Sequence, residues 1–302
     1  MKNSKPLTLR GIVPPMITPL LGNDQLDVDG LERLLERMIS GGVHGMFVLG
    51  TTGEAPSLSY RLRREVIRES ARIIRGRVPM LVGVTDTSFE ETLSLSAYAA
   101  ENGADALVVA PPYYFAPSGR ELRQYYANLA KQLPLPMILY HMPELTKVWF
   151  DQDLVKFAID TPEIIAMKDS SGNLDFFWRT VQLARVRPGF PVLVGPEHLL
   201  AASVRLGGSG GVNGGANVFP EFFVQMFEAA QANDVPVMDA LQKKIDRLND
   251  IYAVAKGGMA VCRGIKYALQ CLGICGELPA EPFHVMPNDE KQKIEAILAE
   301  LK

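Results

Sequence analysis

One lysine occupies a position where a charged side chain is costly. Lys168 directly follows the apolar run Ile164 to Met167, which has the composition of a strand buried on both faces. Burial lowers the pKa of an unpaired ammonium, and a neutral amine in a pocket is a competent nucleophile toward a ketone. Two alternatives stay open: the side chain extends from the strand end to water, or it pairs with Asp169.

Other polar residues follow predicted strands and could share a site with this lysine. Tyr140 ends an apolar run, and its phenol could move a proton to or from a substrate oxygen, although a core tyrosine bonded to the backbone has the same sequence signature. Gly50-Thr51-Thr52-Gly53 is a turn where two hydroxyls and several amides converge, which suits a carboxylate. The turn lacks the lysine and the spacing of a phosphate loop, so nucleotide binding is disfavoured.

Histidines and glycines give weaker signals. The four histidines, His44, His141, His198 and His284, show no HExxH spacing and no convincing cluster with carboxylates, which disfavours a metal-dependent aldolase or hydrolase. The glycine-rich stretch from 207 to 215 lies where many barrels bind phosphate. Close packing of a tight last strand explains this stretch equally well. We therefore predict no metal site.

The elements that must position these residues are predicted from apolar runs whose starts lie about 20 to 35 residues apart, the length of a βα unit. The runs are continuously apolar rather than alternating, as in parallel strands covered on both faces. They are Ile12-Val13, Met46 to Leu49, Met80 to Val84, Ala106 to Ala110, Met137 to Tyr140, Ile164 to Met167, Val192 to Val194 and a glycine-rich stretch through Val212.

Helix signals separate these runs. Apolar residues from Leu31 to Ile39 recur at offsets of three and four and are followed by Gly41-Gly42. Ser88 with Glu91 and Ser118 with Glu121 have the spacing of capping boxes. Eight strands that each precede a helix favour closure, because a closed sheet has no exposed edge. The predicted fold class is α/β, a (β/α)8 TIM barrel.

The end of the chain is predicted to be a helical appendage to the barrel. Pro220 begins a helix with one apolar face that completes the barrel, and two or three further helices follow from about residue 234. We therefore predict a barrel over residues 1–233, with its site at the carboxyl ends of the strands, and a C-terminal helical region over 234–302.

Composition excludes several classes of protein. The 302 residues include 31 Lys+Arg and 34 Asp+Glu, a net charge of −3, which disfavours nucleic acid as a partner. No run of 18 apolar residues occurs, and the segment Met1 to Arg10 has no following apolar run of secretory length. Cys262, Cys271 and Cys275 are too few for a disulfide scaffold and are predicted to be small buried side chains. We expect a cytoplasmic protein with no membrane partner.

Taken together, these residues resemble the dihydrodipicolinate synthase and N-acetylneuraminate lyase superfamily, Schiff-base lyases on (β/α)8 barrels, over nearly the whole chain. The motifs that carry the resemblance occur in the family's order and spacing. They are Gly50-Thr51-Thr52-Gly53-Glu54, Tyr140 with Pro143, Lys168, Gly195 and the glycine-rich eighth strand. The resemblance identifies Lys168 as the residue that forms an imine with a 2-keto acid, with no other cofactor.

The resemblance also implies roles for neighbouring residues. Tyr140 is similar in position to the family's proton-transferring tyrosine, and Thr51 and Thr52, with amides such as that of Gly53, would hold the substrate carboxylate. Tyr114 matches a tyrosine that completes the proton relay, often from a neighbouring subunit. A homo-oligomer is therefore implied, with a tetramer as the family expectation.

One departure from the motif affects the second substrate. Dihydrodipicolinate synthases usually carry an arginine two residues after the proline of the fifth-strand motif, where it clamps a second carboxylate; this chain has Leu145. Lys147 is a point charge at a different site and is expected to be solvated. The pattern is more similar to the branch of sialic acid lyases and 2-keto-3-deoxy sugar acid enzymes.

Residues near the last two strands would complete the substrate site. Glu197 and His198 fall where the lyase branch places polar groups for substrate hydroxyls, although Pro196 makes the match partial and a helix N-terminus would favour a carboxylate in any case. Asn213 either reaches the substrate or serves a turn. The predicted substrate-binding set is Thr52, Gly53, Gly195, Glu197, Val212 and Asn213.

The functional hypothesis is a class I lyase, aldolase or dehydratase that acts on a 2-keto acid, with pyruvate as the common fragment. Its first alternative is dihydrodipicolinate synthase, which condenses pyruvate with aspartate semialdehyde. A non-catalytic barrel that binds a keto acid is the second, although Thr51, Tyr114, Tyr140 and Lys168 are all present. A class II aldolase is the third.

Overall fold

A closed parallel sheet forms the centre of the computed structural model, which describes residue 7 and residues 9–301. The strands pair in chain order from β4 to β10, and β10 pairs with β1. They are β1 (Gly11–Ile12), β4 (Met46–Val48), β5 (Met80–Gly83), β6 (Ala106–Val109), β7 (Met137–His141), β8 (Ile164–Asp169), β9 (Val192–Val194) and β10 (Gly210–Gly211). The predicted eight-stranded fold is confirmed.

The ring closes between β4 and the segment that follows β1. Phe47 N donates a hydrogen bond to Pro14 O at 2.9 Å, and Met16 N donates to Phe47 O at 2.8 Å. These bonds continue the parallel ladder, so the first and last strands of the row are not free edges. The chain is therefore a TIM barrel, as its strand count predicts.

Side chains alternate between two separate apolar layers. Val108, Ile138 and Ala166 belong to the smaller cluster inside the barrel, while their neighbours Leu107 and Leu139 belong to the larger cluster between sheet and helices. This alternation follows from the two-residue period of a strand. It explains why the runs are continuously apolar: both faces of each strand are covered.

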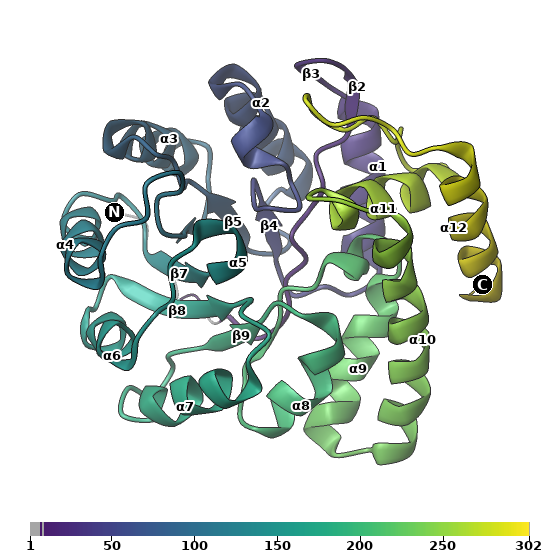
Figure 1. Cartoon of the computed structure of the whole chain (residues 1–302). Coiled ribbons are helices and arrows are strands. Elements are labelled where there is room, and N and C mark those ends of the chain that lie inside the picture. The colour runs from purple at the N-terminus through teal and green to yellow at the C-terminus, as the bar shows by residue number, and fades with distance from the viewer. Residues whose placement is uncertain (1–6, 8, 302) are drawn as a thin grey trace.

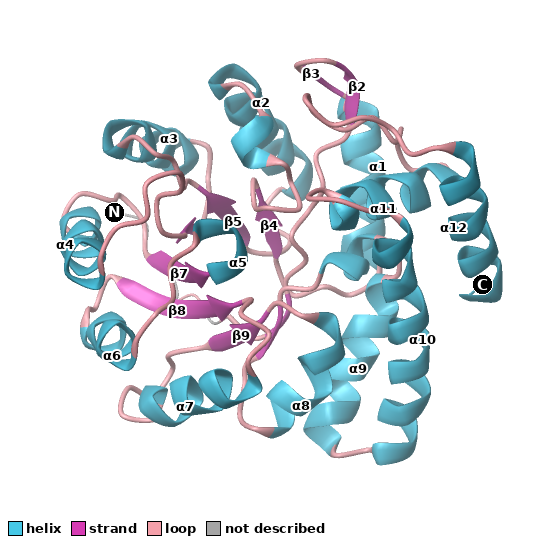
Figure 2. Ribbon diagram, viewed as in Figure 1, coloured by secondary structure: helices cyan, strands magenta, loops and turns pink. Residues whose placement is uncertain are grey.

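Helices cover the outside of the barrel (Figures 1 and 2). The longer ones are α1 (Val28–Ser40), α2 (Tyr60–Ile74), α3 (Phe89–Glu101), α4 (Gly119–Ala130), α6 (Gln152–Asp160), α7 (Leu174–Ala184), α8 (Leu200–Arg205) and α9 (Pro220–Ala232). Short elements lie in the connections: the hairpin β2 (Leu20–Gly22) with β3 (Gln25–Leu26), α5 (Pro143–Thr146), and the 3-10 turns 55–57, 197–199 and 214–217.

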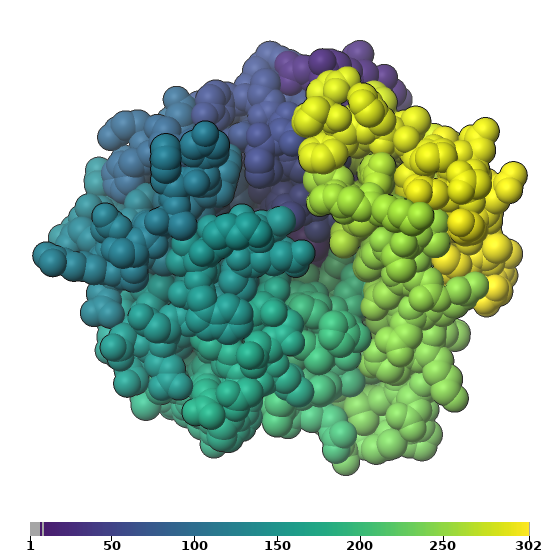
Figure 3. Space-filling model, viewed as in Figure 1, coloured from purple at the N-terminus to yellow at the C-terminus, as the bar shows by residue number. Residues whose placement is uncertain are grey.

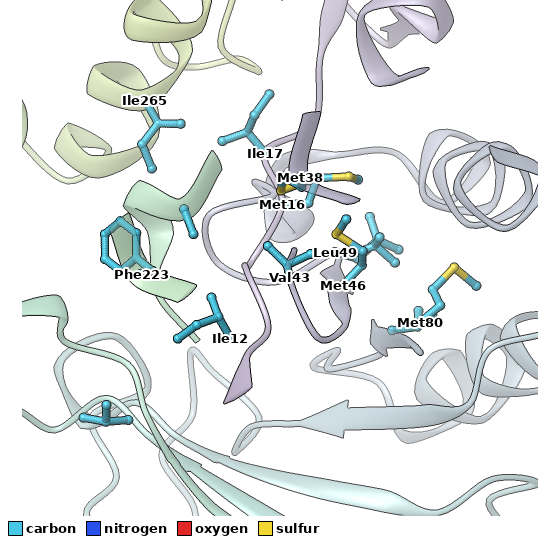
Figure 4. Packing of buried hydrophobic residues seen from close by; sticks show 14 of the residues in the cluster. Ile12, Met16, Ile17, Met38, Val43, Met46, Leu49, Met80, Phe223 and Ile265 are labelled. Atoms are coloured by element: carbon cyan, nitrogen blue, oxygen red, sulfur yellow. The ribbon is translucent and has the colours of Figure 1, made fainter. Parts of the chain in front are cut away.

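Local signals explain where several helices begin. Ser118 and Glu121 form the complete capping box at α4, and the Ser88 side chain accepts from Glu91 N at α3. Pro220 occupies the first turn of α9, as predicted. Figure 4 shows part of the outer core, where Ile12 of β1, Met46 of β4 and Met80 of β5 contribute buried side chains.

Three C-terminal helices pack beside the barrel: α10 (Val235–Val254), α11 (Ala260–Cys271) and α12 (Asn288–Leu301). The predicted boundary at residues 233 and 234 falls in the turn between α9 and α10. Apolar residues such as Ile245 and Ile265 belong to the same core cluster as the barrel helices, so the two parts share one core.

The structure bears on two expectations drawn from composition, the burial of the cysteines and the lack of a membrane-spanning segment. Cys262 and Cys275 are buried as predicted, whereas Cys271 is only partly buried. Within the described range, no helix is both long and apolar enough to cross a membrane. The first six residues, part of the segment considered for secretion, lie outside the described residues.

Candidate active site

Lys168 lies inside the barrel near the carboxyl end of β8. Ala166, two residues earlier, belongs to the interior cluster, so strand alternation directs Lys168 inward as well. Its exposed fraction is 5%, which confirms that an amine is buried here. Register pairs Lys168 with Tyr140 on β7, and the two strand ends thus bring both residues to the same height in the barrel.

The amine of Lys168 faces aromatic rings. Its Nζ lies 4.0 Å from the ring centroid of Tyr140 and 5.2 Å from that of Phe47. Burial lowers the pKa of Lys168 below its usual value of 10.5, and the nearby Tyr140 opposes this shift in part. Both alternatives considered for this lysine are wrong: it does not reach bulk water, and Asp169 points to the opposite face of the sheet and bonds to His141.

Tyr140 and Thr51 form a hydroxyl pair next to this amine. Thr51 Oγ1 and Tyr140 Oη lie 3.3 Å apart. The turn that carries Thr51 is closed by Glu54 N, which donates to Thr51 O at 3.0 Å, and Gly53 O accepts from Thr18 Oγ1 at 2.7 Å. A hydroxyl pair beside an amine with a lowered pKa can pass protons to and from a substrate oxygen.

Two connected cavities open at this end of the barrel. The larger, of about 540 Å³, is lined by Lys168 and Thr52. The smaller, of about 260 Å³, is mainly apolar and extends toward Tyr113. Thr51 and Tyr140 line both. Figure 3 shows this face hollowed near its centre, between teal residues of the barrel and yellow-green residues of the C-terminal helices.

Residues after β9 and β10 form another wall of the larger cavity. Gly195 is tightly packed, because a Cβ there would lie 2.0 Å from the Ser170 hydroxyl oxygen and would force Ser170 to shift. Asn213 is fully buried and its Nδ2 donates to Gly195 O at 2.9 Å, so it joins two strand ends. Val212 is buried and lines the cavity, as does Gly195.

Glu197 brings a carboxyl group to this wall. Its Oε1 accepts from Gly215 N at 2.6 Å and from Tyr252 Oη at 3.0 Å. Burial raises the pKa of Glu197 to about 7, although these hydrogen bonds favour the charged form. The neighbouring His198 is exposed and lies at the edge of the same cavity.

Tyr114 does not join the other predicted catalytic residues within one chain. Its exposed fraction is 89%, and its ring packs edge-to-face on exposed Phe115 with centroids 4.9 Å apart. Its backbone φ is 80°, a left-handed conformation that costs energy for a residue with a side chain. The loop after β6 therefore holds this tyrosine outward.

The order of these features is that of a known family. The model of the dihydrodipicolinate synthetase family matches residues 8–301. The chain belongs to this family.

Relatives of the chain within the dihydrodipicolinate synthetase family have more than one activity. The present chain is 33% identical to the probable 2-dehydro-3-deoxy-D-pentonate aldolase YjhH of Escherichia coli, over 95% of this chain and 96% of the relative. It is 32% identical to the 4-hydroxy-tetrahydrodipicolinate synthase of Methanocaldococcus jannaschii, over 97% and 98%.

Solved structures of the family have the same fold. A dihydrodipicolinate synthase from Bacteroides thetaiotaomicron has a TM-score of 0.94 at 48% identity, with 97% of this chain and 99% of that chain covered. YagE from Escherichia coli, in complex with pyruvate, has a TM-score of 0.91 at 29% identity, with 97% and 98% covered. The present chain is an enzyme of this family, a lyase or aldolase that acts on a 2-keto acid.

At the position where dihydrodipicolinate synthases usually carry an arginine, this chain places a leucine in the cavity lining. Leu145, on α5, has an exposed fraction of 47% and lines both cavities. Lys147 is exposed, and its amine donates to Glu144 O rather than entering the site. No arginine is among the described residues that line either cavity.

Sequence reasoning missed a histidine with a carboxylate partner. His141 Nδ1 lies 2.9 Å from Asp169 Oδ1, a pair that no spacing in the sequence indicates. No group of three or more His, Cys, Asp or Glu side chains arranged to hold a metal ion occurs at residue 7 or between residues 9 and 301.

The C-terminal helices contribute residues that were also missed. Tyr252 reads in sequence as part of an apolar helix face, but its hydroxyl bonds to Glu197. Cys262 lines the larger cavity, with its sulfur 3.7 Å from Thr51 O, and burial raises the pKa of its thiol to about 12. No motif in the sequence indicates either contact.

Proposed function

We propose that Lys168 forms the imine with the 2-keto acid, and that Tyr140 and Thr51 move the protons this requires. The observation that carries the proposal is the buried amine of Lys168, which faces the Tyr140 ring at 4.0 Å instead of a carboxylate. A lysine with a lowered pKa supplies the neutral amine that attacks a ketone. Tyr140 has its ring against this amine and its hydroxyl 3.3 Å from that of Thr51, so both hydroxyls lie near the proposed chemistry.

The reaction balances with these groups alone. Lys168 Nζ bonds to C2 of the keto acid, and the ketone oxygen leaves as water. The C4 hydroxyl then loses a proton as the C3–C4 bond breaks, the imine accepts the electron pair, and an aldehyde departs. The enamine takes a proton at C3, and water releases pyruvate and the amine. Tyr140 is the proposed carrier of these protons.

The substrate carboxylate is proposed to bind at the turn after β4. Thr52 is buried and lines the larger cavity, and Thr51 lies between the two cavities. Hydroxyls and backbone amides of such a turn, including that of Gly53, suit a carboxylate without a cation. This places the keto acid between the turn and Lys168.

A 2-keto-3-deoxy sugar acid is the proposed substrate class. None of the described residues that line the two cavities is an arginine able to bind a second carboxylate, and Leu145 occupies the position where one would be expected. Polar groups at the far wall, Glu197 and Tyr252, suit hydroxyl groups. We therefore propose that Glu197, Gly195 and Val212 form the wall for the hydroxylated part of the substrate, and that Asn213, which lies outside the cavity lining, holds Gly195 in place through its hydrogen bond to Gly195 O.

Dihydrodipicolinate synthase activity is the second candidate, favoured by the names of a 48% identical structure and a 32% identical relative. A panel of 2-keto-3-deoxy acids, sialic acid and pyruvate with aspartate semialdehyde separates the two. Faster turnover of a sugar acid is expected. Faster condensation of aspartate semialdehyde would refute the proposed substrate class, and loss of activity with a chelator would indicate a class II aldolase.

Tyr114 is proposed to act in a second copy of the chain, within a cytoplasmic homotetramer. Its exposed ring and that of Phe115 suit an interface with another protomer. The test mixes two inactive variants, Tyr114→Phe and Lys168→Met. If Tyr114 serves a neighbouring site, mixed oligomers regain part of the activity, because some sites receive both intact residues. No recovery in oligomers shown to be mixed would refute this role.

The imine itself is tested by incubation with pyruvate and borohydride. A reduced pyruvyl adduct is expected on Lys168, identified by mass spectrometry of peptides. A folded protein that gains no adduct, or gains it on another lysine, would refute the proposed function. Borohydride without pyruvate is the control.

A further inference from the structure

A second cross-strand pair lies beside the proposed catalytic pair. The register of β7 and β8 places Tyr140 opposite Lys168 and His141 opposite Asp169. Because side chains alternate, Tyr140 and Lys168 point into the barrel while His141 and Asp169 point toward the helices. The two pairs therefore occupy opposite faces of the same strand ends.

The hydrogen bonds of His141 show which ring nitrogen accepts and which donates. Its Nε2 accepts from Phe150 N at 3.2 Å, so this nitrogen carries no proton. The proton of the neutral ring is then on Nδ1, which donates to Asp169 Oδ1 at 2.9 Å. Both side chains are buried, so the hydrogen bond between them is shielded from water.

Asp169 extends this connection beyond the two strands. Its Oδ1 also accepts from Ser171 N at 3.0 Å, and its Oδ2 accepts from Ser171 Oγ at 3.1 Å. Its backbone oxygen accepts from Gly195 N at 2.7 Å. One aspartate thus joins the end of β7, the loop after β8 and the end of β9, all next to Lys168.

Aromatic packing holds the histidine ring in place. The ring stacks on Phe150, with centroids 4.6 Å apart and an interplanar angle of 21°, and its other contacts are Trp149 and Phe176. This environment leaves the imidazole little rotational freedom. A fixed ring fixes the position of Asp169, and with it the strand end that carries Lys168.

We propose that His141 and Asp169 are positioning residues, which hold the β7 and β8 ends in the register that places Lys168 against Tyr140. This rests on the proposed imine chemistry at Lys168. Neither His141 nor Asp169 lines either cavity. The pair therefore acts through the backbone, which connects His141 to Tyr140 and Asp169 to Lys168. A displacement of about 1 Å at a reacting group is enough to slow a reaction about 100-fold.

The test compares His141→Phe, Asp169→Asn and His141→Asn with the parent protein. The rate of reductive trapping is measured at saturating pyruvate, together with the pyruvate concentration that gives half this rate. His141→Phe and Asp169→Asn are expected to slow the saturating rate by about 10- to 100-fold, with little change in the half-saturating concentration, because the carboxylate turn is untouched. A double variant that combines His141→Phe with Asp169→Asn is expected to be no slower than the slower of these two single variants.

Two further variants separate positioning from stability. His141→Asn keeps a donor toward Asp169 and is expected to recover much of the saturating rate. Phe150→Leu removes only the stacked ring and keeps the hydrogen-bonded pair, so it is expected to lower stability and to slow the trapping step much less than His141→Phe does. If His141→Phe and Asp169→Asn remain folded and trap pyruvate at the parent rate, the positioning role is refuted. If the parent itself gains no adduct on Lys168, the proposed function is refuted as well.

Discussion

Among the residues that the structure describes, two lysines are buried, and their surroundings differ. Lys266, on α11, is fully buried, pairs with the buried carboxylate of Glu54 and donates to Leu278 O at 2.7 Å. Lys168, in β8, faces the rings of Tyr140 and Phe47. Among the described residues, no carboxylate forms an ion pair with Lys168. Burial is therefore common to both, and only the partners differ.

The partners explain what each lysine does. The Glu54 carboxylate also accepts from Ala280 N at 2.7 Å, so the pair joins the turn that carries Thr51 to the C-terminal region. A buried ion pair of this kind is weak evidence for net stability, but removal of one partner is costly. Lys168 has no such compensation, and its pKa is lowered as a result. An uncompensated buried amine therefore distinguishes Lys168, the proposed reactive lysine, from the paired Lys266.

The largest expected effect comes from removing the amine of Lys168. Lys168→Met should abolish the pyruvate adduct and lower turnover by about 10⁴-fold or more, because no other group can form the imine. Lys266→Met, at the other buried lysine, should still form the adduct on Lys168. Peptide mass spectrometry after borohydride treatment measures both. An adduct on Lys266 in the Lys168→Met protein would contradict the distinction between the two lysines.

The next effect concerns stability. Glu54→Gln or Lys266→Met should each destabilise the fold by about 3–5 kcal/mol, because each leaves a buried group without its partner. The double variant should lose less than the sum of the two, because it leaves no unpaired charge. Urea unfolding at a fixed protein concentration measures these differences. A single variant that loses less than about 1 kcal/mol would show that the site is not sealed from water.

The contrast also separates what the sequence predicts from what it does not. Lys168, Tyr140 and Thr51 were predicted as one site because each follows an apolar run, and the carboxyl ends of parallel strands meet at one end of a barrel. The sequence signal for each of these site residues therefore lies within or next to its own strand. The barrel fold is predicted in the same way, from apolar runs that are separated by the length of a βα unit.

Contacts between distant segments carry no such signal. Lys266 follows Ile265 in an amphipathic helix, where a lysine normally faces solvent, and nothing in sequence pairs it with Glu54. His141 and Asp169 meet only because two strands adopt a particular register. The outward position of Tyr114 depends on a left-handed backbone that its residue type does not favour.

The smallest expected effect is a gain in stability on replacing Lys168. The folded protein holds the pKa of Lys168 below 10.5, so between the lowered value and 10.5 the unfolded chain binds more protons, and this term makes stability rise with pH. Lys168→Met removes the term. The variant should therefore have a higher Tm than the parent at neutral pH, by a margin that shrinks as the pH approaches 10.5. Thermal unfolding at several pH values measures this margin. A margin that stays constant or grows with pH would mean that Lys168 is compensated, as Lys266 is.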